Sequence, residues 1–294
     1  MEKSIKKVLL ITNFNIYDKA QAALRVAEKL SGLGCEVCTL TYNKDKIIRL
    51  RSRVWFTFFS AEDAYREVDA VIVLGGDGTI LESARRCAPF GTPVLGLNLG
   101  RLGYMAELEL GEIDKLERIA SGEYNLETRS MINIEIINAE DGDVRKSEYA
   151  LNDAVLSNGS ISRVVDLELY EGGVQIASYR SDGMIVSTPT GSTAYSLAAG
   201  GAIVDPRLEC LLVTPICPHS LYARPMVFTD SACLEIKNTC QREKTLFLTV
   251  DGRVNYELSL GDVVRITRSP LKTCFIRLKD ASFYEKLRQK MTDK

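Results

Sequence analysis

A glycine-rich turn with one carboxylate, GGDGT at residues 75–79, is the segment best suited to chemistry. It follows the apolar run VIVL and precedes an amphipathic segment, so it lies where a buried strand ends and a helix begins. Glycine backbone can approach a ligand closely, and the N–H groups at a helix start suit phosphate. Asp77 by itself repels phosphate, but it makes chemical sense where it accepts a hydroxyl proton or where Mg²⁺ bridges it to phosphate.

The same turn also has a purely structural interpretation. A tight strand-to-helix turn uses Asp as a turn residue, and Thr79 with Glu82 matches a capping box that would fix the helix start. The turn has neither the GxxxxGK[ST] pattern of a P-loop nor the GxGxxG pattern of a dinucleotide turn. The composition of this turn leaves a structural and a catalytic role for Asp77 equally open.

A second cluster, RSDGMIVSTPTGSTAYSLAAGG at residues 180–201, is dense in small and hydroxyl residues. We expect a strand, a Pro–Thr–Gly bend and a helix start, a surface on which a flat ligand lies against backbone and hydroxyls bind ribose and amide groups. Asp182 precedes a glycine, as Asp77 does, and LNDAVLS adds the polar pair Asn152 and Asp153. Asp accepts two hydrogen bonds from vicinal hydroxyls, and Asn both donates and accepts. Separately, these segments are also typical of turns and close helix packing.

Strand and helix patterns alternate over residues 6–105, and the strands are apolar on both faces. This predicts an α/β domain, residues 1–105, with a doubly wound, mostly parallel sheet that carries GGDGT. From about residue 128 the hydrophobic period becomes two, so we expect a β-rich domain over residues 106–268. The segment 269–294 ends in a helical pattern, and we expect it to pack back on the first domain.

Composition excludes several classes of protein. The 294 residues are 46% hydrophobic and 26% charged, with a net charge of −2 and a single histidine, His219. These proportions of apolar and charged residues predict a soluble protein with a buried hydrophobic core, and the slightly negative net charge predicts no nucleic-acid partner. No run reaches the roughly 18 apolar residues that a membrane span needs. The first apolar run, VLLI, is too short for a signal peptide, so we expect a cytoplasmic protein with reduced cysteines and no membrane partner.

Taken together, the sequence resembles the NAD kinase family. The resemblance covers most of the chain and is carried, in order, by GGDGT, GLNLGRLGYMAE, LNDAVLS, the block at residues 180–201, PHSLYARPMV and VDGR. It implies transfer of a phosphoryl group from ATP to the 2′-hydroxyl of the adenosine ribose of NAD, giving NADP. It also implies Mg²⁺ or another divalent cation that arrives with ATP rather than in a cage of protein ligands, and a homo-oligomer, a dimer or a tetramer.

The resemblance also assigns site residues. Asp77 is the candidate base or metal-organising carboxylate, and the backbone of Gly75, Gly76, Gly78 and Thr79 is the candidate phosphate site for ATP. The implied NAD-binding residues are Asp77, Gly78, Asn152, Asp153, Arg163, Arg180, Asp182, Thr190, Thr193, Ala194, Tyr195, Ser196, Leu197, Ala198, His219 and Arg253. Asp153 stands where the family often has Glu, and Ala198 where it often has Ser.

Two other functions stay open at this stage. Lipid and small-alcohol kinases share the GGDGT turn, although such an enzyme needs an acyl channel, against which the small-residue block argues. A non-catalytic dinucleotide sensor would use Asp77 only as a turn residue.

Overall fold

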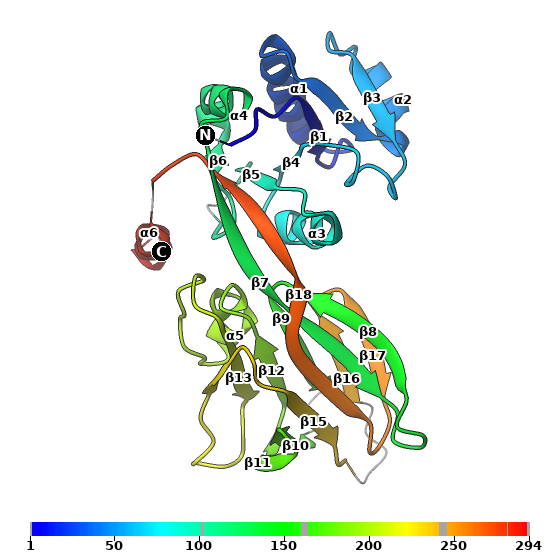
Figure 1. Cartoon of the computed structure of the whole chain (residues 1–294), viewed down its shortest axis with the longest axis vertical. Helices are drawn as coiled ribbons and strands as arrows, with labels where there is room; N and C mark the ends of the chain where they lie inside the picture. Colours follow the sequence, from blue (N-terminus) through cyan, green and yellow to red (C-terminus); the bar gives the residue numbers. More distant parts are fainter. Residues whose placement is uncertain (1, 101–102, 160–163, 241–245, 281, 293–294) are drawn as a thin grey trace. The chain divides into compact units, whose positions relative to one another are not determined.

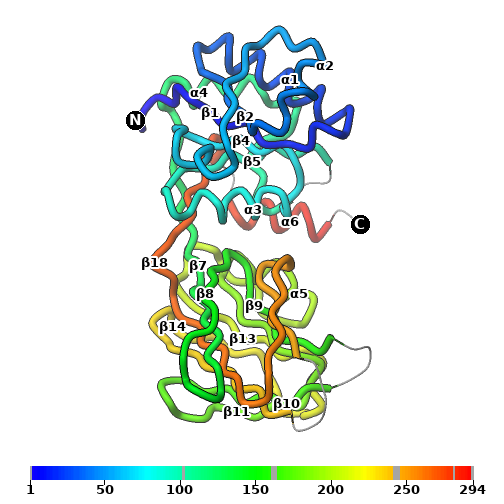
Figure 2. The backbone as a smooth tube through the Cα atoms, turned by 90° about the vertical axis from the view of Figure 1, so that its right-hand side faces the viewer, coloured from blue at the N-terminus to red at the C-terminus, as the bar shows by residue number. Residues whose placement is uncertain are grey.

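The computed structural model describes residues 2–100, 103–159, 164–240, 246–280 and 282–292. By their contacts, the residues form two compact units. Unit 1 comprises residues 1–128 and 272–294, and unit 2 comprises residues 129–271. The chain passes between the units twice, in β7 and in β18 (Figure 2).

Unit 1 contains a parallel sheet in the order β3-β2-β1-β4-β5, with β6 pairing to β5 (Figure 1). The last part of β18 adds to it, because Phe275 pairs in parallel with Val94 of β5. The strands are β1 (Lys7–Ile11), β2 (Glu36–Leu40), β3 (Phe56–Phe59), β4 (Ala70–Leu74), β5 (Val94–Asn98), β6 (Leu108–Glu109) and β18 (Val263–Arg277). The α-helices are α1 (Tyr17–Gly32), α2 (Lys44–Arg49), α3 (Asp77–Cys87), α4 (Glu117–Ser121) and α6 (Phe283–Thr292), and the 3₁₀ helices are η1 (Thr41–Asn43), η2 (Ala88–Phe90) and η3 (Leu110–Leu116).

Helices cover both faces of this sheet. Val8, Leu10 and Ile72 share one buried core with Val26 and other residues of α1. Successive strand residues point to opposite faces, so Gly96 faces the other side, where a Cβ would lie 2.6 Å from Cδ1 of Ile80 in α3. The predicted doubly wound, mostly parallel sheet is therefore confirmed.

Unit 2 consists of two sheets around one core. The first is antiparallel, in the order β14-β13-β12-β9-β16-β17, and the second has the order β11-β10-β15-β18-β7-β8. Inward residues of both, among them Leu156, Met184, Ile134 and Ile236, form one buried cluster. The elements are β7 (Asn125–Ile137), β8 (Val144–Ala150), β9 (Asp153–Asn158), β10 (Val165–Glu171), β11 (Val174–Ser181), β12 (Gly183–Ser187), β13 (Cys210–Ile216), β14 (Met226–Thr229), β15 (Leu234–Asn238), β16 (Leu246–Val250) and β17 (Val254–Leu258), with η4 (Gly191–Thr193) and α5 (Tyr195–Ala198).

The β-rich second part and the terminal helix agree with the sequence. The units divide at 128/129 and 271/272, whereas the sequence placed its boundaries at 105/106 and 268/269. Residues 106–128 belong to unit 1 by their contacts, because β6 pairs with β5 and η3 packs against α1. None of the helices in the described part of the chain has the length and apolar character that a bilayer crossing requires.

Candidate active site

The GGDGT turn joins β4 to α3, as the sequence predicted, but the helix begins at Asp77 with Gly76 as its N-cap. The capping box of Thr79 and Glu82 is wrong, because Glu82 instead forms ion pairs with Arg85 and Arg86 further along the same helix. Asp77 thus occupies the first position of an 11-residue helix, where the helix dipole favours a negative side chain.

The three glycines of the turn do not use positive φ, which glycine commonly supplies. A Cβ at Gly75 would lie 3.0 Å from the Thr79 side chain, so this position must be small. Gly76 and Gly78 are exposed, and no atom of the described residues lies within 4 Å of the position that a Cβ would take. Because neither residue has a side chain, the N-terminus of α3 is left open to a ligand.

The Asp77 carboxylate is held by the backbone of a neighbouring loop. Its Oδ2 accepts a hydrogen bond from Tyr104 N at 2.8 Å, and its Oδ1 accepts one from Met105 N at 3.2 Å. A Cβ on Gly103 would collide with both carboxylate oxygens, so glycine is required there for close approach. Burial and the nearby Asp77 charge raise the pKa of Tyr104. The carboxylate is half-buried and has a fixed orientation.

In unit 2, the start of β9 is organised by one carboxylate, that of Asp251. Its Oδ1 accepts hydrogen bonds from the backbone N–H groups of Asn152 at 2.8 Å and Asp153 at 3.1 Å, and its Oδ2 accepts one from Leu151 at 3.0 Å. Asp251 has a left-handed backbone with φ of 47°. It therefore fixes the backbone that presents the Asn152–Asp153 pair.

Asp153 is only 5% exposed. Burial, with the Asp251 charge as a second cause, raises the pKa of Asp153 to about 7. Asp153 is therefore partly protonated near neutral pH and can donate as well as accept a hydrogen bond. The amide oxygen of Asn152 is buried and has no hydrogen-bond partner among the described residues, so its capacity to accept a hydrogen bond is unused there.

A pocket of about 430 Å³ lies within unit 2 at these residues. Four of the predicted NAD-binding residues line it together: Asn152, Asp153, Ala194 and Tyr195. Val155, Ser157, Thr249, Asp251 and Gly252 complete the lining. Tyr195 is 47% exposed.

The Pro–Thr–Gly bend packs directly on the Asn152 backbone. The Thr188 hydroxyl donates to Leu151 O at 2.6 Å and accepts from Gly191 N at 3.1 Å. A Cβ at Gly191 would collide with backbone atoms of Asn152, which explains the glycine at this position. This contact brings the two polar clusters of the sequence together.

Other predicted residues of this block have different surroundings. Thr190 accepts a hydrogen bond from Arg129 at 3.4 Å, and the Thr193 hydroxyl donates to Thr190 O at 3.3 Å. Ser196 is fully buried, and its hydroxyl pairs with that of Thr214 at 2.9 Å. Leu197 is half-buried and Ala198 is exposed, and neither lines the pocket.

Arg180, Asp182 and His219 are exposed, and backbone hydrogen bonds link the two segments that carry them. His219 N donates to Arg180 O at 2.9 Å, and Asp182 N donates to Ile216 O at 2.9 Å. Arg253 is exposed in the turn after Asp251. Arg163 lies outside the described residues.

Asp251 was not predicted as a site residue, although it lies in the VDGR segment that carries part of the family resemblance. The sequence feature that could have indicated it is an Asp–Gly dipeptide at the end of a strand, which also occurs at Asp77 and Asp182. Among the described residues, no group of three or more His, Cys, Asp and Glu side chains is arranged to hold a metal ion.

Comparison with known proteins shows the family of this chain. The sequence model for the ATP-NAD kinase N-terminal domain matches residues 8–124, and that for the ATP-NAD kinase C-terminal domain matches residues 151–278. The chain belongs to the NAD kinase family. The NAD kinase of Symbiobacterium thermophilum is 46% identical over 78% of this chain and 80% of its own length. That of Citrifermentans bemidjiense is 37% identical over 92% of this chain and 93% of its own.

Solved structures of NAD kinases have the same fold. The yeast NADH kinase in complex with NADH superposes with a TM-score of 0.88 at 25% identity, covering 99% of this chain and 88% of that one. The NAD kinase of Archaeoglobus fulgidus in complex with ATP has a TM-score of 0.69 at 23% identity, covering 97% of each chain, and supports the fold.

Proposed function

We propose that this NAD kinase family member transfers the γ-phosphoryl group of Mg-ATP to the 2′-hydroxyl of the adenosine ribose of NAD, giving NADP. The observation that carries the assignment is the pocket of unit 2, because Asn152, Asp153 and Tyr195 line it together, in a chain of this family.

Unit 2 supplies the groups that bind the dinucleotide. Asn152 accepts a ligand N–H or O–H at its unpartnered Oδ1. Asp153 binds ribose hydroxyls, and its raised pKa lets it donate as well as accept near neutral pH. The ring of Tyr195 provides a surface for a flat group. The exposed residues Arg180 and His219 contact the dinucleotide outside this pocket.

Unit 1 supplies the groups for phosphoryl transfer. Such transfer needs an aligned hydroxyl and a neutralised triphosphate, with little covalent chemistry from the protein. Asp77 orients the 2′-hydroxyl and accepts its proton, since two backbone N–H groups hold the carboxylate while leaving it further lone pairs. The exposed start of α3 at Gly76 and Gly78 accommodates phosphate oxygens.

The proposal also covers the metal ion, the location in the cell and the number of subunits. The divalent cation enters as part of the Mg-ATP substrate, the protein acts in the cytoplasm, and it forms a dimer or a tetramer. Exposed apolar side chains in unit 2, at Leu221, Tyr222 and Val227, support self-association. Light scattering during size-exclusion chromatography tests the subunit number.

The proposal is tested by offering the purified protein Mg-ATP with NAD, NADH or a dispersed diacylglycerol. We expect NADP from NAD, detected with an NADP-specific dehydrogenase. Phosphorylated lipid instead of NADP would identify a lipid kinase. Tight NAD binding without any phosphorylated product would identify a dinucleotide sensor.

A further inference from the structure

The terminal helix α6 is attached to unit 1 by polar contacts rather than by a buried apolar face. None of its described residues is buried. Lys286 Nζ donates to Ala106 O at 2.9 Å and pairs with Glu107 Oε2 at 3.3 Å. One turn further along, Lys290 Nζ lies 4.3 Å from the centre of the Tyr104 ring. Both lysines thus contact one short segment, residues 103–107, which we call the 103–107 strap.

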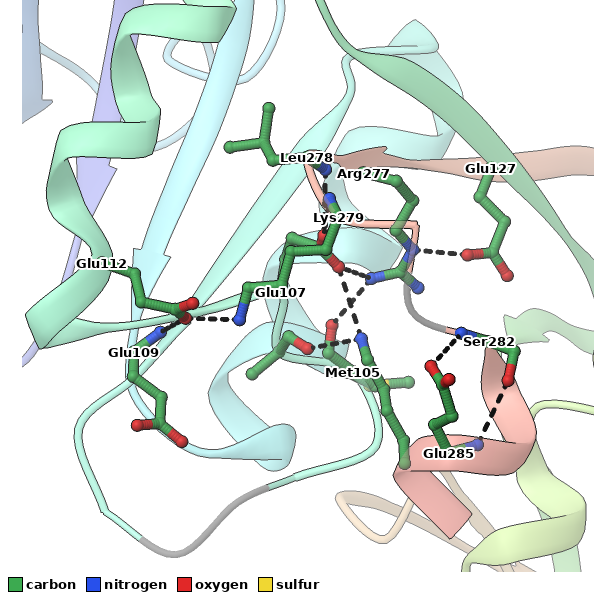
Figure 3. Close-up of polar contacts among 12 residues, drawn as sticks. Met105, Glu107, Glu109, Glu112, Glu127, Arg277, Leu278, Lys279, Ser282 and Glu285 are labelled. Carbon is green, nitrogen blue, oxygen red and sulfur yellow. Dashed lines mark hydrogen bonds and ion pairs between the residues drawn. The ribbon is translucent and has the colours of Figure 1, made fainter. Parts of the chain in front are cut away.

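Glu107 anchors the strap to the end of β18. It is 4% exposed, and its Oε1 accepts hydrogen bonds from the backbone N–H groups of Leu278 at 2.9 Å and Lys279 at 2.8 Å. Its Oε2 pairs with Arg277 at 3.2 Å, and Arg277 also pairs with Glu127 (Figure 3). A buried carboxylate with this many partners holds a fixed position.

The strap also holds Asp77. The strap residues Tyr104 and Met105 donate the two N–H groups that fix the Asp77 carboxylate, and Gly103 allows their close approach. Arg277 also donates to Met105 O at 3.4 Å. The contacts run without interruption from Lys286 through Ala106 and Glu107 to the amides that orient Asp77.

We infer that α6 is a positioning element for phosphoryl transfer: Lys286 fixes the 103–107 strap, and the strap holds the Asp77 carboxylate in its reactive orientation. This inference rests on the catalytic role proposed for Asp77. Lys286 does not touch the reacting groups, so it acts only through the strap. Burial lowers the pKa of Lys286, with the charge of Arg277 as a further cause, while Glu107 opposes the shift.

A purely structural role for Lys286 would only tether the end of the chain. The two roles are separated with the variants Lys286→Met and Lys286→Arg, and Lys279→Met as a matched control. Lys279 belongs to the same cluster of ion pairs, but its side chain pairs with Glu112 and not with the strap. All variants are made in the full chain.

The first measurement is amide hydrogen exchange at Tyr104 and Met105. We expect Lys286→Met to speed exchange of these two amides by about tenfold or more. Lys279→Met should leave both unchanged, and Lys286→Arg should retain most of the protection. Unchanged exchange in Lys286→Met overturns the inference, whatever the activity of the protein.

The second measurement is NADP formation in single and double variants. A misplaced reacting group costs up to about 100-fold in rate, so we expect Lys286→Met to lower kcat by about 10- to 100-fold, with KM for NAD within about twofold. In an Asp77→Asn background the same change should have no further effect, because both act on one group. An equal loss of kcat in both backgrounds overturns the inference. Full activity of Asp77→Asn alone refutes the role of Asp77, while the exchange result still reports whether α6 holds the strap.

Discussion

Replacing Asp251 with Asn should weaken both unit 2 and its binding of NAD. The Asp251 carboxylate accepts three backbone hydrogen bonds, from Leu151, Asn152 and Asp153. Asn keeps one acceptor oxygen, which can serve Asn152 and Asp153, and its amide NH₂ then faces the N–H of Leu151. Asn also tolerates the left-handed backbone at this position, so the change adds no backbone strain.

The magnitude follows from these three contacts. A buried N–H that loses its partner costs about 1–3 kcal/mol, and the bonds that remain lose the contribution of a charged acceptor. Relief of the repulsion between Asp251 and Asp153 offsets part of this loss. We expect the free energy of unfolding to fall by about 2–4 kcal/mol, which corresponds to roughly 5–10 °C in Tm.

The assay combines urea unfolding with calorimetric titration of NAD. Because Asp251 fixes the backbone of Asn152, we expect NAD affinity to fall by about tenfold or more, or 1.4 kcal/mol per tenfold. Asp262→Asn is the matched control: Asp262 is also buried and accepts backbone N–H groups, from Ala139 and Ser259, but it does not line the pocket. The control should lose stability and keep its NAD affinity. Unchanged stability and affinity in Asp251→Asn would show that the Asp251 carboxylate does not hold the backbone of residues 151–153.

Two further predictions concern Asp153 and Gly103. The folded-state pKa of Asp153, about 7, lies above its ordinary value of 3.8, so its protonation stabilises the fold fully below about pH 4, and this contribution is lost as the pH rises through about 7. In urea titrations at several pH values, this group should lower the free energy of unfolding of the unaltered protein by a few kcal/mol as the pH rises from about 4 to about 7. Asp153→Asn should remove that fall, and an unchanged pH profile in the variant contradicts the raised pKa. Gly103→Ala should displace the Asp77 carboxylate and lower kcat by at least about tenfold while NAD affinity is kept; a normal kcat would show that the carboxylate tolerates the displacement.

The sequence predicted the parts of the fold that depend on local pattern. Strands such as AVIVL at residues 70–74 are apolar throughout because both faces of the sheet are covered, and this pattern is visible in the sequence. Short strands at sheet edges, such as β3 and β14, were not predicted, since a few residues with one partner carry little periodic signal.

The polar contacts between distant segments could not be predicted in the same way. Asp77 was identified from its own turn, but the amides that hold it come from residues 104 and 105. Asp251 organises residues about 100 positions earlier in the chain, and nothing in the VDG segment indicates those partners. The capping-box spacing placed the helix start at Thr79. That spacing occurs here by chance, because Glu82 pairs with Arg85 and Arg86 instead.

In the proposed reaction, the Asp77 carboxylate orients the ribose 2′-hydroxyl and accepts its proton during phosphoryl transfer. A rapid-quench measurement of a single turnover tests this role, with NAD and ATP labelled in its γ-phosphate, in the unaltered protein and in Asp77→Asn. We predict transfer to the 2′-hydroxyl that is at least about 100-fold slower in the variant, with NAD affinity unchanged. Transfer at the same rate in both proteins would contradict this role.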